Sequence, residues 1–306
     1  MRRLIALAGA TATGKTAIGE VLAEAVGGAV VCADARQVYR ELEIGTGKPT
    51  PAQRAARPHA LFDLWSLGER VSAGAWARAA TEACERLLTA GVTPVLVGGS
   101  GLYVSALERG LHPEPPKDPA LRAELEREWT ATGAEAMHAR LASLDRAAAA
   151  SLKARDRQRV LRALEIVSSS GHVLAWWRDR ARQSPLDAEW RTFEVTCAPA
   201  RLAERIAART VTMWREGLLD EVRGIVAAGK GPALRRLGAI GYDEALDVLE
   251  GTSTEAVARE RMDQRTRQLA KRQRTWFRHQ LRATTVEGTL DEAGRIAARI
   301  NREALG

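Results

Sequence analysis

The chain has 306 residues, of which 45% are hydrophobic and 27% charged, as in a folded globular protein rather than a disordered one. Its 46 Lys and Arg exceed its 38 Asp and Glu, and the formal charge of +8 permits an anionic partner such as nucleic acid without requiring one. The sequence has no run of the ~18 apolar residues that a membrane-spanning helix needs. Its three cysteines are scattered, which argues against a disulfide framework or a zinc site. We therefore expect a cytoplasmic protein with no membrane partner.

The first hundred or so residues alternate short apolar runs with helical spacings. In chain order these patterns predict strands at 4–8, 29–33 and 94–97, and helices at 18–26 and 72–90. Such a succession is typical of a parallel sheet covered by helices.

The composition changes after about residue 115. From 120 to 182 the chain is rich in Ala, Arg and Glu, with helical spacing and no strand pattern, and a strand is expected again at 192–197. The sequence thus predicts an α/β fold, a P-loop NTPase-like parallel-sheet core interrupted by a helical domain. We place the core at 1–115 and 196–306 and the insertion at 116–195.

A phosphate-binding loop lies between the first predicted strand and helix. Residues 9–16, Gly-Ala-Thr-Ala-Thr-Gly-Lys-Thr, match the pattern G-x-x-x-x-G-K-[ST] in full. Glycines let backbone N–H groups turn toward phosphate oxygens, and the helix N-terminus adds the positive end of its dipole. Lys15 is expected to reach a terminal phosphate, and the Thr16 hydroxyl to complete a Mg²⁺ shell. The strand and helix around this segment disfavour the alternative of a flexible Gly/Thr loop. The candidate phosphate-binding residues are Gly9, Ala10, Thr11, Ala12, Thr13, Gly14, Lys15 and Thr16.

Asp34 follows the second predicted strand, at the edge where open α/β sheets bind ligands. It could hold a metal through water or act as a general base, and the alternative is an ordinary loop aspartate or a helix N-cap. The glycine-rich stretch 44–50, with one lysine, is suited to backbone contact with a polar ligand.

Seven sequence blocks, in this order and spacing, resemble tRNA dimethylallyltransferases, the bacterial tRNA isopentenyltransferase family. They are the phosphate loop at 9–16, Asp-Ala-Arg-Gln-Val-Tyr-Arg at 34–40, Ile-Gly-Thr-Gly-Lys-Pro-Thr at 44–50, Val-Gly-Gly-Ser-Gly-Leu-Tyr at 97–103, and the blocks at 156–165, 240–244 and 266–278. The match extends over nearly the whole chain and is far more specific than the phosphate loop alone.

The resemblance implies transfer of a dimethylallyl group from dimethylallyl diphosphate to N6 of the adenosine just 3′ of the tRNA anticodon, with release of diphosphate. Diphosphate rather than ATP would then occupy the phosphate loop, with Mg²⁺ as cofactor. Arg209 aligns with the family's diphosphate-contacting arginine, and Asp34 with the carboxylate that accepts the amine proton. Ser100 stands where the family usually has threonine and keeps the hydroxyl. The implied catalytic residues are Asp34, Ser100, Lys15 and Arg209.

The resemblance also implies contacts with the anticodon stem-loop of tRNA. The aligned positions are Asp34, Ala35, Arg36, Gln37, Ser100, Arg122, Gln158, Arg159, Val160, Leu161 and Arg162. Two of the chain's residues depart from the family pattern nearby: Ala35 replaces a frequent serine, and Gly47 a frequent alanine. We expect the protein to be a monomer.

The segment 259–282 contains nine basic and two acidic residues. On a helix, five of the cations share a face, at 267, 271, 274, 278 and 282. Two interpretations stay open: a stripe that follows RNA phosphates, or the solvated face of a packed helix. Two alternative functions also remain, a small-molecule kinase that uses ATP in the same loop and a non-catalytic RNA-binding protein.

Overall fold

The computed structural model describes residues 2–69, 71–182, 186–288 and 292–305. The chain forms two compact units, one from 1–108 with 185–306 and the other from 109–184. The strand β5 (Glu189–Thr196) belongs to the sheet of the first unit. The core therefore resumes earlier than residue 196, because the strand expected at 192–197 begins at Glu189 and belongs to this sheet.

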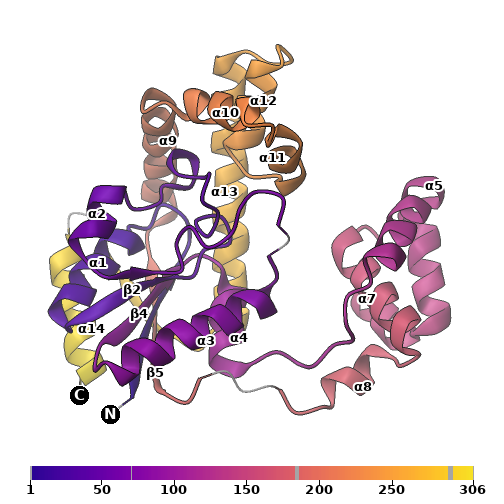
Figure 1. The fold of residues 1–306 in the computed structure, drawn as a ribbon, viewed down its shortest axis with the longest axis horizontal. Coiled ribbons are helices and arrows are strands. Elements are labelled where there is room, and N and C mark those ends of the chain that lie inside the picture. The colour runs from indigo at the N-terminus through magenta and orange to yellow at the C-terminus, as the bar shows by residue number, and fades with distance from the viewer. Residues whose placement is uncertain (1, 70, 183–185, 289–291, 306) are drawn as a thin grey trace. The chain divides into compact units, whose positions relative to one another are not determined.

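The first unit is built on a six-stranded sheet in which every pairing is parallel (Figure 1). Across the sheet the order is β3 (His59–Ala60), β2 (Gly28–Cys32), β4 (Thr93–Gly98), β1 (Arg3–Gly9), β5 and β6 (Thr284–Glu287). Ala8 of β1 is in register with Gly98 of β4 and Glu194 of β5. The loops that follow β1 and β4 therefore leave the same edge side by side.

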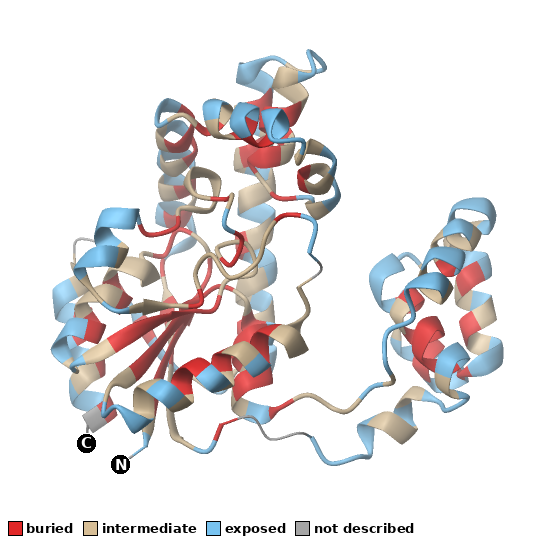
Figure 2. Ribbon diagram, viewed as in Figure 1, coloured by how far each residue is buried: buried red, intermediate tan, exposed pale blue. Residues whose placement is uncertain are grey.

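Helices cover both faces of this sheet. On one face, α1 (Lys15–Ala25) and α14 (Ala293–Leu305) bury an apolar core that includes Ile5, Leu7 and Phe193. Figure 1 shows α3 (Ala73–Thr89) and α4 (Gly101–Arg109) on the side of the sheet away from α1 and α14. The central strands are buried on both faces, as their continuous apolar runs predict (Figure 2).

A group of helices follows β5 in the first unit. They are α9 (Pro199–Arg215), α10 (Leu218–Ala227), α11 (Gly231–Leu237), α12 (Tyr242–Leu249) and α13 (Glu255–Gln280), and α9 packs against α13. Two short helices, η1 (Ile44–Thr46) and α2 (Pro51–Ala56), lie in the segment after β2. Helix α13 ends at Gln280 because Leu281 takes an extended conformation that leads into β6. Arg282 therefore lies beyond the basic helical face on which it was expected.

The second unit is helical, as predicted. It comprises α5 (Pro119–Leu144), α6 (Arg146–Ser151), α7 (Arg157–Ser170) and α8 (Leu174–Arg178). Buried residues such as Leu125, Met137 and Leu164 form its own core. The buried Asp145 accepts hydrogen bonds from the Ala148 and Leu174 amides with its two carboxylate oxygens, and so ties α6 to α8.

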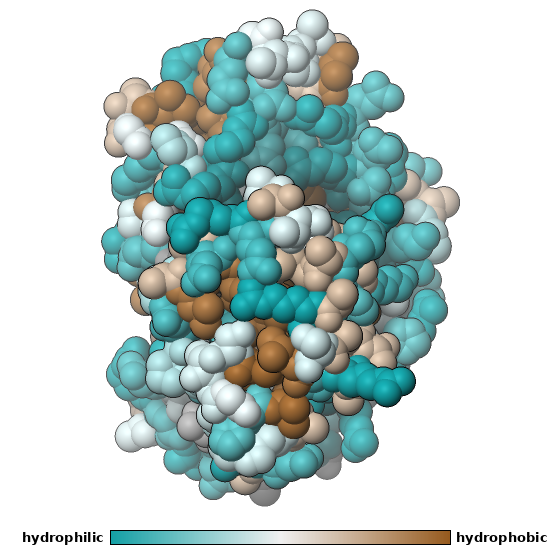
Figure 3. Space-filling model, turned by 90° about the vertical axis from the view of Figure 1, so that its right-hand side faces the viewer, coloured by the Kyte–Doolittle hydropathy of each residue, from teal (hydrophilic) through white to brown (hydrophobic). Residues whose placement is uncertain are grey.

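The face shown in Figure 3 is covered mainly by hydrophilic side chains, and its apolar side chains form separate groups. Within the described parts of the chain, no helix has both the length and the apolar character needed to span a bilayer. Cys32, Cys84 and Cys197 are free and buried, and they pack as small core residues.

Candidate active site

The loop between β1 and α1 turns tightly around the start of the helix. Ala12 and Gly14 both have left-handed φ angles, of 64° and 91°, and Gly14 is the N-cap of α1. The amide and hydroxyl of Thr13 donate to the Ala10 carbonyl at 3.4 and 2.9 Å, and Lys15 Nζ donates to the same carbonyl at 3.3 Å. The loop therefore has the compact form that the motif predicts, with its lysine folded over it.

Two cations and one carboxylate determine the electrostatics beside this loop. Burial lowers the pKa of Lys15 from 10.5 to about 8, while nearby Asp34 raises it and Arg209 lowers it further. Burial also lowers the pKa of Arg209, and Asp34 again acts in the opposite direction. Because desolvation disfavours both cations, an anion bound between them would be strongly attracted.

Asp34 lies just beyond the C-terminal end of β2. Its Oδ1 accepts hydrogen bonds from the amides of Arg36 at 2.8 Å and Gln37 at 3.4 Å. This oxygen therefore stabilises the turn that follows β2, as the oxygen of an ordinary loop aspartate can. Oδ2 has no hydrogen-bond partner among the described residues, so half of the carboxylate is held in place and the other half can accept a proton.

Ser100, after β4, connects the loops of two neighbouring strands. Its Oγ accepts a hydrogen bond from the Ala35 amide at 2.9 Å, and its own amide donates to the Ala33 carbonyl at 3.2 Å. The serine hydroxyl makes this contact without the methyl group of a threonine. Because a hydroxyl that accepts one hydrogen bond can still donate another, Ser100 keeps a donor for a ligand.

Arg209 projects from α9 to the turn at η1. Its guanidinium donates to the Thr46 carbonyl at 2.9 Å, and the Gln37 amide group donates to the carbonyls of Thr46 and Gly47, both at 3.2 Å. The turn at η1 thus positions Arg209. The N–H donors of the Gln37 side chain are occupied by hydrogen bonds within the protein.

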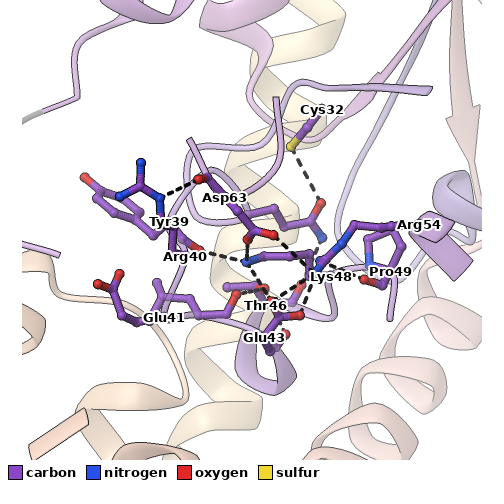
Figure 4. Close-up of polar contacts among 12 residues, drawn as sticks. Cys32, Tyr39, Arg40, Glu41, Glu43, Thr46, Lys48, Pro49, Arg54 and Asp63 are labelled. Carbon is purple, nitrogen blue, oxygen red and sulfur yellow. Dashed lines mark hydrogen bonds and ion pairs between the residues drawn. The ribbon is translucent and has the colours of Figure 1, made fainter. Parts of the chain in front are cut away.

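A buried lysine fixes the loop that carries Asp34 and this turn (Figure 4). The side chain of Lys48 is fully buried, and its ammonium donates to the Tyr39 carbonyl at 2.7 Å, to Glu43 at 3.3 Å and to Asp63 at 2.5 Å. A buried cation needs such partners, because desolvation without them is costly. The lysine of the 44–50 block therefore supports the site from behind and does not face a ligand.

A cavity of about 410 Å³ opens onto these residues within the first unit. Thr11, Asp34, Ser100 and Arg209 line its polar side, whereas Lys15 and Thr16 do not line it. Its apolar lining includes Ile206, Met213, Ile240, Met262 and Leu269. The cavity thus places a polar wall that includes Arg209 and an apolar wall beside the Asp34 carboxylate.

The metal-binding capacity of the site is limited to few protein oxygens. The described residues contain no group of three or more His, Cys, Asp or Glu that could form a metal cage. Mg²⁺ commonly takes one or two protein oxygens and completes its shell with phosphate and water. Thr16, in the first turn of α1, fits a metal that arrives with a diphosphate.

In the second unit, two of the candidate tRNA-binding arginines share one buried carboxylate. Glu165, whose side chain is 5% exposed, lies 3.7 Å from the Arg122 guanidinium and 2.8 Å from that of Arg162. Arg162 also pairs with Glu114 at 2.6 Å. Each arginine keeps about a fifth of its side chain exposed. Arg122 also pairs with Glu126 at 2.8 Å, so three carboxylates hold the two guanidiniums in place.

The block 158–162 divides between surface and core. Gln158 and Arg159 are exposed, and Arg159 pairs with Asp156 at 2.8 Å. Val160 and Leu161 are fully buried in the core of the helical unit. Their side chains point into the core, so Gln158, Arg159 and Arg162 are the members of the block whose side chains reach the surface. The tRNA contact of this block stays a prediction.

The basic helix α13 divides in the same way. Its first cations form ion pairs: Arg259 with Glu255, Arg261 with Asp247, Arg265 with Glu244, and Arg267 with Asp263. Lys271, Arg272, Arg274 and Arg278 have no ion pair within the part of the chain that the structure describes. The solvated-face interpretation therefore suits the first half of the helix, and the second half leaves its charges available.

The structure adds two residues to the site that spacing alone does not indicate. The Gln273 side chain accepts a hydrogen bond from the Thr11 amide at 2.9 Å, and Arg205 donates to the Thr13 carbonyl at 3.5 Å. Arg205 precedes Arg209 by one helical turn, and Gln273 lies in the 266–278 block. Only that resemblance could have drawn attention to Gln273.

Comparisons with known proteins agree with this arrangement. The family model described as IPP transferase matches residues 37–280. A tRNA dimethylallyltransferase of Geobacter sulfurreducens is 41% identical over 90% of this chain and 89% of the relative, and one of Stenotrophomonas maltophilia is 40% identical over 97% of both.

Solved structures give the same result. A full-length tRNA isopentenylpyrophosphate transferase from Bacillus halodurans is 32% identical, with a TM-score of 0.71, and the match covers 100% of this chain and 97% of that one. A eukaryotic dimethylallyltransferase acting on tRNA has a TM-score of 0.82 at 23% identity, covering 98% of this chain and 77% of that one, and supports the fold alone. The α/β, P-loop NTPase-like fold and the transferase class are confirmed. The chain belongs to the IPP transferase family, as its motifs predict.

Proposed function

We propose that the protein transfers a dimethylallyl group from dimethylallyl diphosphate to N6 of the adenosine just 3′ of the anticodon of a tRNA. The observation that carries the proposal is one cavity in which Asp34, Ser100 and Arg209 meet the phosphate loop. The names of the relatives support the same reaction. Membership of this family disfavours a kinase or a non-catalytic RNA-binding protein.

The diphosphate leaving group would occupy the phosphate loop. As the allylic C–O bond breaks, negative charge develops on the diphosphate, and the cationic Lys15 and Arg209 are placed to stabilise it. Mg²⁺, held by Thr16 and the diphosphate, would supply further positive charge. The apolar wall around Met213 and Leu269 suits the five-carbon chain.

Asp34 would act as the general base. The adenine amine forms the new N–C bond as the C–O bond breaks, and its surplus proton passes to the free Oδ2 of Asp34. The bonds from Arg36 and Gln37 to Oδ1 keep the carboxylate oriented during this step. An exocyclic amine is a weak nucleophile, so its alignment matters, and the hydroxyl of Ser100 is placed to contribute to it.

The helical unit, 109–184, would contact the anticodon stem-loop. Its exposed Gln158 and Arg159 offer polar and cationic contacts, and the partly exposed guanidiniums of Arg122 and Arg162, held by Glu165, offer hydrogen-bond donors. The unpaired cations of α13 would follow RNA phosphates on the first unit. An enzyme that modifies one base takes that base out of the stack, which suits a target in a loop rather than a duplex. We propose that a monomer performs this work.

The competing functions differ in what they consume. Purified protein with Mg²⁺ should release diphosphate from dimethylallyl diphosphate only when unmodified tRNA is present, and ATP should not replace the prenyl donor. Consumption of ATP with a phosphorylated product would instead support a kinase. Binding of tRNA with no turnover of either compound would support a non-catalytic protein.

A further inference from the structure

The side-chain amide of Gln273, on α13, bridges two loops of the candidate active site. Its Oε1 accepts a hydrogen bond from the Thr11 amide at 2.9 Å, and its Nε2 donates to the Gly99 carbonyl at 2.9 Å. Thr11 belongs to the phosphate loop, and Gly99 immediately precedes Ser100. One side chain therefore joins the diphosphate-binding loop to the loop that carries Ser100.

The bridge requires both halves of a primary amide. A glutamine offers one acceptor and one donor group, whereas a carboxylate cannot donate and an alkyl side chain can do neither. The space is also specific, because a Cβ at Gly99 would lie 2.5 Å from Nε2 of Gln273. A side chain at position 99 would thus displace the amide from its place.

The contact holds a strained part of the phosphate loop. Ala12, next to Thr11, has a φ of 64°, a left-handed conformation that residues with a side chain rarely adopt. Such a residue persists only where its neighbours are fixed. The bonds from Thr13 to Ala10 fix the loop from within, and Gln273 fixes it from outside.

We propose that Gln273 is a positioning residue that sets the shape of the phosphate loop for diphosphate. This inference rests on the proposed function, since it concerns the same substrate. The inference concerns the binding of diphosphate alone. The bridge does not directly contact the groups proposed to carry out the chemical step or to bind tRNA.

The first test uses inorganic diphosphate with Mg²⁺, titrated calorimetrically into the protein without tRNA. Loss of the two bonds in Gln273→Ala should raise the Kd for diphosphate about tenfold, given a net ~1 kcal/mol for each hydrogen bond and some relaxation of the loop. The KM for dimethylallyl diphosphate should rise in parallel, while kcat and the KM for tRNA stay within about twofold. The exposed Gln264 on the same helix provides the control, and Gln264→Ala should bind diphosphate as the original protein does.

A double-mutant cycle separates positioning from general destabilisation. Gly99→Ala should weaken diphosphate binding because its methyl group displaces the Gln273 amide, and adding it to Gln273→Ala should cause no further loss. Additive losses would contradict this shared mechanism. If Gln273→Ala does not fold, the diphosphate affinity of Gly99→Ala by itself still tests the positioning role of Gln273.

Two negative results have different meanings. If the original protein binds diphosphate and Gln273→Ala binds it equally well, the positioning role is wrong and the proposed function stands. If the original protein does not bind diphosphate at all, the proposed function itself is contradicted.

Discussion

The guanidinium of Arg209 occupies the space that a side chain at Gly47 would fill. A Cβ at Gly47 would lie 2.1 Å from the terminal nitrogen of Arg209, the nitrogen that donates to the Thr46 carbonyl at 2.9 Å. Gly47 also has a left-handed φ of 58°. The position of the Arg209 guanidinium in this chain therefore depends on glycine at position 47.

Gly47→Ala should therefore disturb the site as well as the fold. We expect a loss of about 1 kcal/mol in stability from the left-handed backbone, and a several-fold rise in the KM for dimethylallyl diphosphate as Arg209 is displaced. Gly91→Ala is the matched control, since Gly91 has a φ of 72° and a Cβ there would meet nothing within 4 Å. It should reproduce the loss of stability with unchanged kinetics, and equal kinetic effects in the two variants would refute the role of Arg209's position.

Asp34→Asn should separate the two tasks of this carboxylate. The amide oxygen can still accept the hydrogen bonds from Arg36 and Gln37, so the turn should persist. The proton acceptor is lost, and kcat should fall by about 10²-fold or more. Thermal unfolding and the binding of both substrates should change little. An unchanged kcat would exclude Asp34 as the base.

Lys15→Ala and Arg209→Ala should impair the use of diphosphate selectively. Each removes a cation that faces the developing charge, so kcat/KM for the prenyl donor should fall by roughly 10²–10³-fold. Filter binding should show nearly unchanged tRNA affinity. An equal loss of tRNA affinity in both variants would contradict the assigned roles.

The low pKa of Lys15 predicts a proton uptake. Burial lowers this pKa to about 8, so in the free protein the ammonium loses its proton as the pH rises past that value. A bound diphosphate favours the charged form, and binding above pH 8 should therefore take up a proton at Lys15. Calorimetry in two buffers of different ionisation enthalpy measures the uptake, and Lys15→Arg, which stays charged, should reduce it. Identical uptake in both proteins would show that Lys15 does not titrate there.

Arg159→Ala tests tRNA contact by the helical unit. Its side chain is 73% exposed, so its removal should not destabilise the fold. We expect weaker tRNA binding and a salt dependence reduced by about one phosphate contact. Arg223→Ala removes another exposed arginine from an i,i+3 ion pair, in the first unit, and should leave tRNA binding unchanged. Equal effects of the two substitutions would indicate a general charge effect instead.

The sequence indicated the fold wherever a strand carries a continuous apolar run. Two strands escaped prediction because they lack one: β3 has only two residues, and of the four in β6 only Val286 is buried. Neither edge strand needs a strong pattern of its own, because the central strands already define the sheet.

The sequence predicted those site residues that directly follow a recognisable strand. The phosphate loop and Asp34 follow consecutive strands, and parallel strands bring their carboxyl ends together. The supporting contacts were not predictable in this way. Gln273 lies 262 residues from Thr11 in the chain, and the buried role of Lys48 depends on Asp63 and Glu43, so only folding reveals these pairs.

The most direct test of the account is nucleoside mass analysis of unmodified tRNA after incubation with the protein, Mg²⁺ and dimethylallyl diphosphate. The proposed reaction should leave one adenosine per anticodon loop, next to the anticodon on its 3′ side, heavier by a dimethylallyl group in place of one hydrogen. That product should be absent with Asp34→Asn. If the wild-type protein binds both substrates and the adenosine is nevertheless recovered without a dimethylallyl group, the proposed reaction is contradicted.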